Sequence, residues 1–298
     1  MQSGFHGVAV DAGSGLAASL REARGADARD DDLLTFKRAV LETLGPHAST
    51  VLVDATCGPD LIDHYPAGCA RMVAFEADVY HISDEDRITV LPDNLNVDDY
   101  PKLGISLLKF FMYYAPDDAP DLNARKHDLV ADIGARCKAA GVQFLMEPLV
   151  YHPTIKAGSE AYARIKPDLV RRATAVFAEP RFQADVLKVE IPVDLSFVEG
   201  FGAPVMSRSE ALDAFQAAAA AANGIDLVYL SAGVTFERFE ASLAMAREAG
   251  VSFSGFMCGR AIWSDAVDVF GKGGEDTLRA WLTDTGTDRL ARLIAALG

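Results

Sequence analysis

Two lysines lie inside apolar segments that otherwise have the composition of buried β-strands. Lys188 and Glu190 interrupt segment 186–191, and Lys109 interrupts segment 107–111. Side chains alternate between the two faces of a strand, so Lys188 and Glu190 share one face and the aliphatic residues between them share the other. The aliphatic face belongs against outer helices, so we expect both charged residues to point into the interior of the sheet.

A lysine in such a place has a specific chemical use. Free lysine titrates near ~10.4, and both desolvation and a neighbouring cation lower that pKa. The neutral amine can attack a ketone and form an iminium, which withdraws electrons so that the C3–C4 bond of a ketose can break. We predict Lys188 as the nucleophile, Lys109 as its cationic neighbour, and Glu147, at the end of the apolar run 144–147, as the proton carrier.

Other carboxylates stand at the ends of predicted strands. Asp11 ends the first and Asp54 the second, and Glu190 lies nearer the strand end than Lys188. We predict a catalytic role for Asp11 and substrate contacts for Asp54 and Glu190. Two alternatives stay open: a carboxylate at a strand end can cap the next helix, as for Asp54, and an interior lysine can belong to a structural ion pair.

Small residues and one arginine follow the last two predicted strands. Ser231 and Gly233 follow the seventh, and Gly259 and Arg260 follow the eighth. Barrel enzymes commonly bind phosphate with these two loops, where backbone N–H groups approach the oxygens and a guanidinium supplies charge. We predict that these four residues bind a phosphate group of the substrate.

Strand and helix patterns alternate eight times along the chain. The predicted strands are 7–11, 50–54, 72–75, 107–113, 143–148, 186–193, 227–231 and 253–258, and the clearest helices are 33–44, 121–140, 159–177, 208–222, 235–249 and 276–296. This order and length predict one α/β domain over residues 1–298, a single (β/α)8 TIM barrel, with an open doubly wound sheet as the alternative. No dinucleotide or Walker fingerprint is present.

The bulk composition limits the partners. A net charge of −15 argues against nucleic acid and against an anionic membrane surface. The six histidines form no ligand pair on one element, so we expect no metal and no cofactor. Four scattered cysteines are typical of unpaired thiols in a cytoplasmic protein, and neither a signal peptide nor a membrane span is expected. A homo-oligomer is possible, although no interface stripe stands out.

The last two-thirds of the chain resembles the class I tagatose 1,6-bisphosphate aldolases, a family that also holds sulfofructose-phosphate aldolases. The resemblance lies in DVLKVEIPVDLSFVEGF (185–201) and FSGFMCGRAIWSDAV (253–267), and also in LLKFFMYYAPDD (107–118), VQFLMEPLVY (142–151) and 228–250. It implies a metal-free barrel, with the Schiff-base lysine at Lys188, the second active-site lysine at Lys109 and the acid/base glutamate at Glu147. It also implies cleavage of a ketose phosphate to dihydroxyacetone phosphate and an aldehyde.

The first third departs from this family. The family usually carries Asp-Gln-Arg at the end of strand one, where this chain has Asp11-Ala12-Gly13, and the only Lys or Arg in segment 76–99 is Arg87. Phosphate, sulfonate or no charge at C6 therefore stay open. Two other functions also stay open: a Schiff-base lyase acting on another keto sugar or keto acid, and a non-catalytic sugar-phosphate-binding regulatory barrel.

Overall fold

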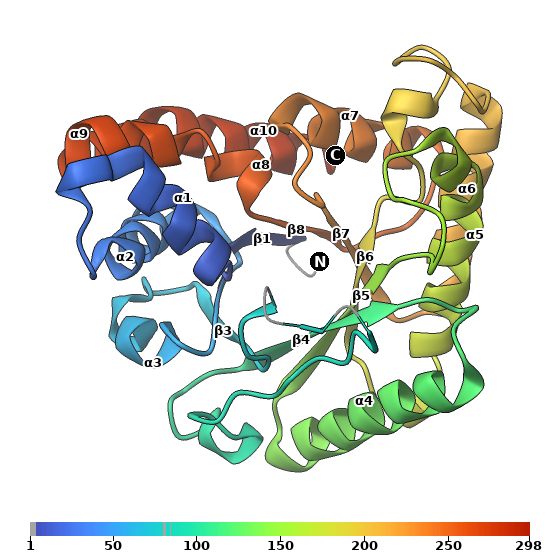
Figure 1. The fold of residues 1–298 in the computed structure, drawn as a ribbon, viewed down its shortest axis with the longest axis horizontal. Coiled ribbons are helices and arrows are strands. Elements are labelled where there is room, and N and C mark those ends of the chain that lie inside the picture. The colour runs from blue at the N-terminus through green and yellow to red at the C-terminus, as the bar shows by residue number, and fades with distance from the viewer. Residues whose placement is uncertain (1–3, 80–81, 84) are drawn as a thin grey trace.

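Eight parallel strands close into a barrel in the computed structural model, which describes residues 4–79, 82–83 and 85–298 (Figure 1). The strands follow one another around the barrel in chain order, and β1 pairs with β8 to close it. Their bounds are β1 Phe5–Ala9, β2 Thr50–Val53, β3 Ala70–Ala74, β4 Leu107–Tyr114, β5 Gln143–Val150, β6 Val186–Glu190, β7 Asp226–Leu230 and β8 Gly255–Cys258. The predicted (β/α)8 barrel is confirmed.

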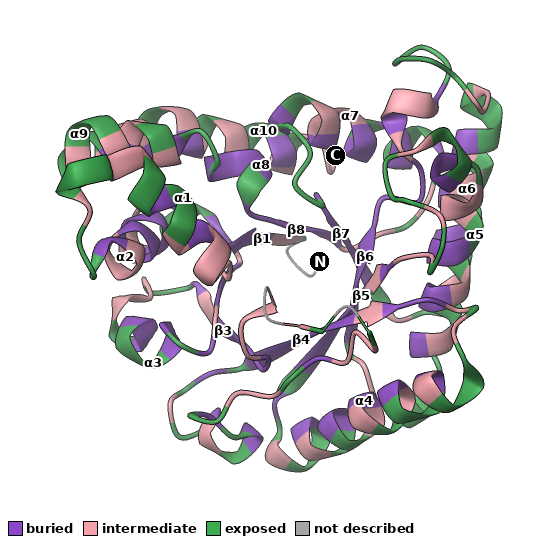
Figure 2. Ribbon diagram, viewed as in Figure 1, coloured by how far each residue is buried: buried purple, intermediate pink, exposed green. Residues whose placement is uncertain are grey.

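Helices form a ring around the strands, and their buried faces turn toward the sheet (Figure 2). The α-helices are α1 Ser14–Arg24, α2 Asp32–Leu44, α3 Gly58–Leu61, α4 Pro120–Ala140, α5 Glu160–Phe177, α6 Arg208–Ala221, α7 Phe236–Glu248, α8 Arg260–Trp263, α9 Ala266–Trp281 and α10 Thr287–Ala295. Side-chain caps set several starts: Ser207 and Glu210 form a reciprocal capping box at α6, and Thr235 accepts a hydrogen bond from the Arg238 amide at α7.

Strand parity divides the core into two layers. The inner layer is a small apolar plug inside the barrel, and it includes Leu107, Leu145 and Val186. Two residues further along each of these strands the inward position is charged, at Lys109, Glu147 and Lys188 respectively. The intervening Leu187 and Val189 belong to the larger core between sheet and helices, as their parity predicts. The barrel interior therefore changes from apolar to ionic toward the carboxyl ends of the strands.

The observed bounds of several strands and helices differ from the predicted ones. Strand six ends at Glu190 rather than 193, and Asp11, Asp54 and Ser231 lie just beyond their strands, because the chain turns into loops there. Helix α1 was not predicted, since glycines in 13–15 obscure its start. The predicted helix 276–296 is the end of α9, a π-helical turn (Leu282–Gly286) and α10.

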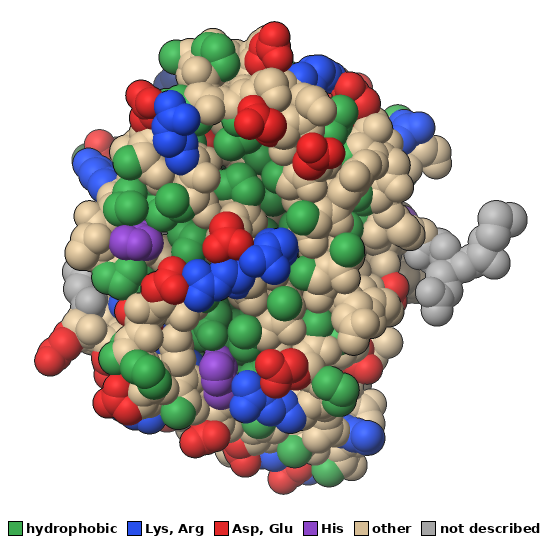
Figure 3. Space-filling view, turned by 90° about the vertical axis from the view of Figure 1, so that its right-hand side faces the viewer, with side chains coloured by type: hydrophobic (Ala, Val, Ile, Leu, Met, Phe, Trp, Pro, Cys, Tyr) green, Lys and Arg blue, Asp and Glu red, His purple; other side chains and the backbone are tan. Residues whose placement is uncertain are grey.

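The outer surface carries mixed charge. On α5, Arg164 pairs with Glu160 and Arg171 with Asp168, and Figure 3 shows basic side chains beside acidic ones on this side of the molecule. Within the described ranges, no helix is both long and apolar enough to cross a membrane. The possible homo-oligomer stays a prediction.

Candidate active site

A pocket of about 700 Å³ opens at the carboxyl ends of the barrel strands. Every residue that the sequence predicted for the site contributes to its lining. This is the end at which (β/α)8 barrels carry their chemistry, because the eight βα-loops meet there. The lining includes an ionic floor, a pair of small-residue loops after β7 and β8, and residues from the ends of the other six strands or from the loops that follow them.

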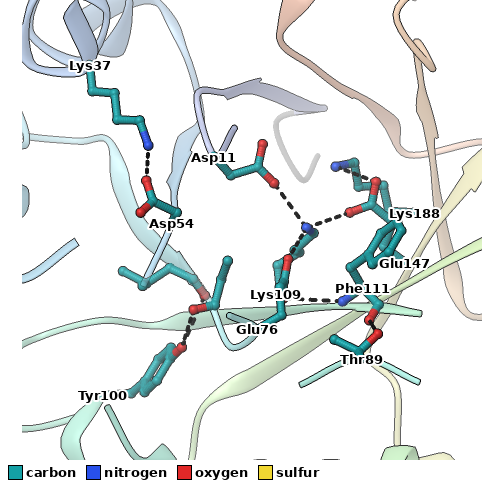
Figure 4. A network of polar contacts seen from close by, with 12 residues as sticks. Asp11, Lys37, Asp54, Glu76, Thr89, Tyr100, Lys109, Phe111, Glu147 and Lys188 are labelled. Atoms are coloured by element: carbon teal, nitrogen blue, oxygen red, sulfur yellow. Dashed lines mark hydrogen bonds and ion pairs between the residues drawn. The ribbon is translucent and has the colours of Figure 1, made fainter. Parts of the chain in front are cut away.

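Glu147 lies between the two interior lysines. Its Oε1 atom is 2.8 Å from Nζ of Lys188, and its Oε2 atom is 2.9 Å from Nζ of Lys109 (Figure 4). The three side chains come from β5, β6 and β4, and each is at most 6% exposed. One carboxylate thus contacts both amines, and a proton can pass directly between Lys188 and Glu147 without an intervening water.

Lys109 is held by three carboxylates. Besides Glu147, it contacts Oδ2 of Asp11 at 3.0 Å and makes a very short contact with Glu76 (Figure 4). Burial alone would lower the pKa of Lys109, but the charges of Glu147, Glu76 and Asp11 outweigh it and hold the pKa well above its usual value. Lys109 is therefore a permanent cation, and its charge is matched by more than one carboxylate.

Glu76 is a site residue that was not predicted from the sequence. It lies two residues beyond β3, is 5% exposed, and its Oε2 accepts a hydrogen bond from the Phe111 amide at 3.3 Å. Burial raises its pKa to about 7; Lys109 opposes the shift, while Asp11 and Glu147 add to it. The signal in the sequence was a carboxylate directly after the apolar run 72–75, but the acidic loop that follows made it look like part of the surface.

Asp11 is ionised and faces the same cluster. Burial would raise its pKa, but the charges of Lys109 and Lys188 and the hydrogen bond from Lys109 lower it, and the pKa lies well below its usual value. Asp11 comes from the loop after β1, across the barrel from β4. The structure thus brings all four predicted catalytic residues into one contiguous network.

The two remaining predicted carboxylates lie at the edges of the pocket. Glu190 accepts a hydrogen bond from the Val150 amide at 2.8 Å and lies 3.5 Å from Nζ of Lys166 on α5. Asp54 makes a very short contact with the buried Lys37 of α2 and accepts hydrogen bonds from the amides of Thr56 and Cys57, both at 3.0 Å. Asp54 therefore fixes the turn after β2 without being the N-cap of α3, which is Cys57, and its substrate contact stays a prediction.

The loops after β7 and β8 approach each other closely. Gly233 has a left-handed backbone (φ +75°), and a Cβ atom there would lie 2.9 Å from the guanidinium carbon of Arg260. A Cβ atom on Gly259 would lie 2.1 Å from the Ala9 carbonyl oxygen, so only glycine lets the β8 loop pack on β1. Ser231 is buried beside them. The four predicted phosphate residues are thus neighbours at one side of the pocket.

Further cations line the pocket away from the floor. Nη1 of Arg238, in the first turn of α7, donates to Oγ of Ser196 at 2.7 Å. The guanidinium of Arg87 lies over the ring of Tyr151, 4.2 Å from its centroid. Neither residue was predicted as part of the site: Arg238 lies in an ordinary polar stretch, and Arg87 was noted only as the one arginine of segment 76–99. Among the described residues, no three His, Cys, Asp or Glu side chains are grouped to hold a metal ion.

Comparisons with known proteins point in one direction. A model described as DeoC/LacD family aldolase matches residues 6–265. A tagatose 1,6-diphosphate aldolase of Listeria monocytogenes serotype 4b is 33% identical over 289 residues, which cover 96% of this chain and 85% of that protein. One of Staphylococcus aureus (strain Newman) is 40% identical over 257 residues, 84% of this chain and 78% of the relative.

Solved structures share the fold. A fructose-bisphosphate aldolase from Plasmodium falciparum superposes with a TM-score of 0.72 at 13% identity, covering 99% of this chain and 91% of that one. An archaeal fructose 1,6-bisphosphate aldolase gives a TM-score of 0.61 at 13% identity, covering 96% and 94%. At such identities the likeness concerns the barrel alone.

Proposed function

The chain belongs to the DeoC/LacD aldolase family, and from this premise we propose that it cleaves a ketose phosphate through a Schiff base on Lys188. Aldolases of this kind are carbon–carbon lyases. The observation that carries the proposal is the contact between Lys188 and Glu147, because it joins a buried amine to a carboxylate able to accept its proton. The products are dihydroxyacetone phosphate and an aldehyde.

Proton movement starts at this contact. The Lys188 ammonium gives a proton to Glu147, and the neutral amine attacks the C2 carbonyl of the open-chain ketose to form a carbinolamine. Glu147 returns this proton to the carbinolamine hydroxyl, which leaves as water, and an iminium remains between C2 and Lys188. The positive charge forms close to ionised Asp11 and the Glu147 carboxylate, which stabilise it electrostatically.

Bond cleavage follows from the iminium. A carboxylate of the cluster, with Glu147 as first candidate and Asp11 as second, takes the proton of the C4 hydroxyl. The electrons of the C3–C4 bond move toward the iminium, which becomes an enamine, and the aldehyde leaves. The enamine is then protonated at C3, and water releases dihydroxyacetone phosphate and regenerates Lys188. Lys109 keeps these carboxylates in place throughout.

The phosphate on C1 fits the loops after β7 and β8. Arg260 offers a charged fork, Ser231 a hydroxyl, and the glycines expose backbone amides. Holding this phosphate orients C2 toward Lys188, because β6, β7 and β8 are adjacent in the barrel. Ser231, Gly233, Gly259 and Arg260 are thus proposed as the group that positions the substrate.

Product analysis tests the activity. Purified protein is incubated with tagatose 1,6-bisphosphate, fructose 1,6-bisphosphate and 6-deoxy-6-sulfofructose 1-phosphate, and dihydroxyacetone phosphate is measured with a coupled dehydrogenase. We expect release from at least one of them, unaffected by EDTA and abolished by Lys188→Ala. The proposal is contradicted if the Lys188→Ala variant still releases dihydroxyacetone phosphate, or if EDTA stops its release by the wild type.

The cellular site is also a proposal. We infer a cytoplasmic enzyme, supported by four cysteines that are all buried and unpaired. The sulfosugar substrate of some family members stays one of the three substrates in this test.

A further inference from the structure

The carboxylate of Asp78, in the loop after β3, occupies the start of α1. The amide of Ser14 donates to Oδ2 of Asp78 at 2.7 Å, and a Cβ atom on Gly13 would lie 2.8 Å from the same oxygen. Gly13, Ser14 and Asp78 all line the pocket. Amides at a helix start are places where a ligand phosphate can bind, and here the protein fills that place with its own anion.

Further carboxyl groups line this part of the pocket. Asp11 and Glu76 also come from the ends of β1 and β3, and Asp11 is ionised. Lys109 lies between these two carboxyl groups and contacts each of them, and it also contacts Glu147. Among the described residues, the β1 and β3 ends therefore present more carboxylates than cations to a ligand.

Arg87 leaves the same loop but lies against the far wall. Its guanidinium stacks on Tyr151 at the end of β5 and lies 5.6 Å from the ring centroid of Tyr113 on β4. Arg87 thus lies near two aromatic rings, where cation–π attraction holds it, and it also lines the pocket. A distal anion bound in this pocket would have to be held there, away from the β1 end.

The chain direction of the substrate follows from the barrel order. With C1 phosphate at the β7 and β8 loops and C2 at Lys188, the rest of the sugar extends across the mouth. The strands opposite β7 and β8 are β3 and β4, and β2 lies beside β3. C5 and C6 therefore extend toward the loop after β3, which carries Asp78.

We propose that this enzyme selects a ketose 1-phosphate whose far end is uncharged, and that Asp78 is a specificity-determining residue. The proposal rests on the proposed function and adds the substrate class. Carboxylates accept hydrogen bonds from sugar hydroxyls, which favours a neutral end. A phosphate dianion roughly 6 Å from one carboxylate is disfavoured on the order of tenfold, even in bulk water. A sulfonate at C6 is also negatively charged, so the same carboxylate repels it too.

Competing substrates test this selection. We compare kcat/KM for tagatose 1-phosphate, fructose 1-phosphate and the two corresponding 1,6-bisphosphates, and we expect the monophosphates to be favoured by about tenfold or more. Asp78→Asn removes the charge but keeps an oxygen that can accept from the Ser14 amide. It should raise the ratio of bisphosphate to monophosphate kcat/KM by about fivefold. The matched control, Asp93→Asn, changes an exposed carboxylate of the same β3–β4 connection and should leave the ratio unchanged.

The outcomes separate the two proposals. A wild-type preference for the bisphosphates, especially one removed by Arg87→Ala, overturns the inference while leaving the aldolase function standing. An unchanged ratio in Asp78→Asn also overturns it. No cleavage of any ketose phosphate, together with no borohydride adduct, overturns the proposed function itself.

Discussion

The Oε1 atom of Glu147 lies 2.8 Å from the Nζ atom of Lys188, inside a barrel whose deeper layers are aliphatic. The other oxygen of the same carboxylate contacts Lys109. Two amines of identical chemistry thus have different surroundings: three carboxylates contact Lys109, whereas one ion pair is found for Lys188 among the described residues. This asymmetry supports the proposed roles, electrostatic support for Lys109 and covalent chemistry for Lys188.

Glu147→Gln removes the proton acceptor while preserving the shape of the side chain. We expect kcat to fall by about 10²–10⁴-fold, the usual contribution of a positioned acid or base, with a smaller change in KM. Steady-state cleavage assays measure both constants, and circular dichroism verifies the fold. Glu179→Gln, at a surface glutamate paired with Arg181, is the control and should keep wild-type kcat. A fall below about tenfold in Glu147→Gln would remove this residue from the proton path.

Lys109→Met leaves Asp11, Glu76 and Glu147 without their shared cation. Breaking a buried pair by removing one partner costs about 3–5 kcal/mol, so the free energy of unfolding should drop by that amount at pH 7. Urea denaturation measures the loss. The double variant Lys109→Met/Glu76→Gln should recover part of it, because one buried charge fewer is left unpaired. If both variants are as stable as the wild type, the cluster is not the ion network described above.

Glu76 gives a pH dependence with a defined sign. Its pKa is raised from 4.5 to about 7 on folding, so the folded protein binds more protons than the unfolded chain between these values. Its contribution to stability is therefore present below about pH 4.5 and is lost as the pH rises to 7. Wild-type stability should fall by roughly 2–3 kcal/mol more between pH 5 and pH 8 than that of Glu76→Gln. Parallel urea curves at the two pH values measure this difference, and equal slopes would contradict it.

Arg260→Ala should separate binding from folding. The side chain is exposed and lies on the Gly233 loop, so the unfolding free energy should change by less than about 0.5 kcal/mol. Loss of a charged hydrogen bond to phosphate should raise KM by about tenfold or more. Arg260→Lys should restore part of the affinity, since the charge returns without the fork. Arg292→Ala, at an exposed arginine, is the control and should leave KM unchanged. If Arg260→Ala also leaves KM unchanged, the phosphate does not bind at Arg260.

The sequence predicted the barrel and a set of residues that the structure brings together in the pocket, because both follow from local rules. Strand alternation was enough to place Lys188 and Lys109 inside, and the loops after the last two strands were recognisable by their small residues. Contacts across the barrel were not predictable: Lys109 meets Asp11 over 98 positions and Glu76 over 33. The roles of Glu76 and Asp78 depend on those long-range contacts, since a carboxylate in an acidic loop looks like solvent-exposed surface in the sequence.

The start of α1 was not predicted either. This helix begins at Ser14, whose amide donates a hydrogen bond to Asp78, 64 positions away. The N-cap residue of this helix is Gly13, which has no side chain to cap it. The Ser, Thr, Asp or Asn that usually marks a helix start in a sequence is therefore absent. The cap comes from another part of the chain, and only the folded barrel brings it there.

Reductive trapping tests the central claim most directly. The protein is treated with sodium borohydride in the presence of dihydroxyacetone phosphate, and the modified residue is located by peptide mass spectrometry, with Lys188→Arg as the comparison. The account predicts one adduct per chain, on Lys188, and none in Lys188→Arg. An adduct on Lys109, or no adduct under conditions in which the enzyme cleaves its substrate, would contradict the Schiff-base mechanism.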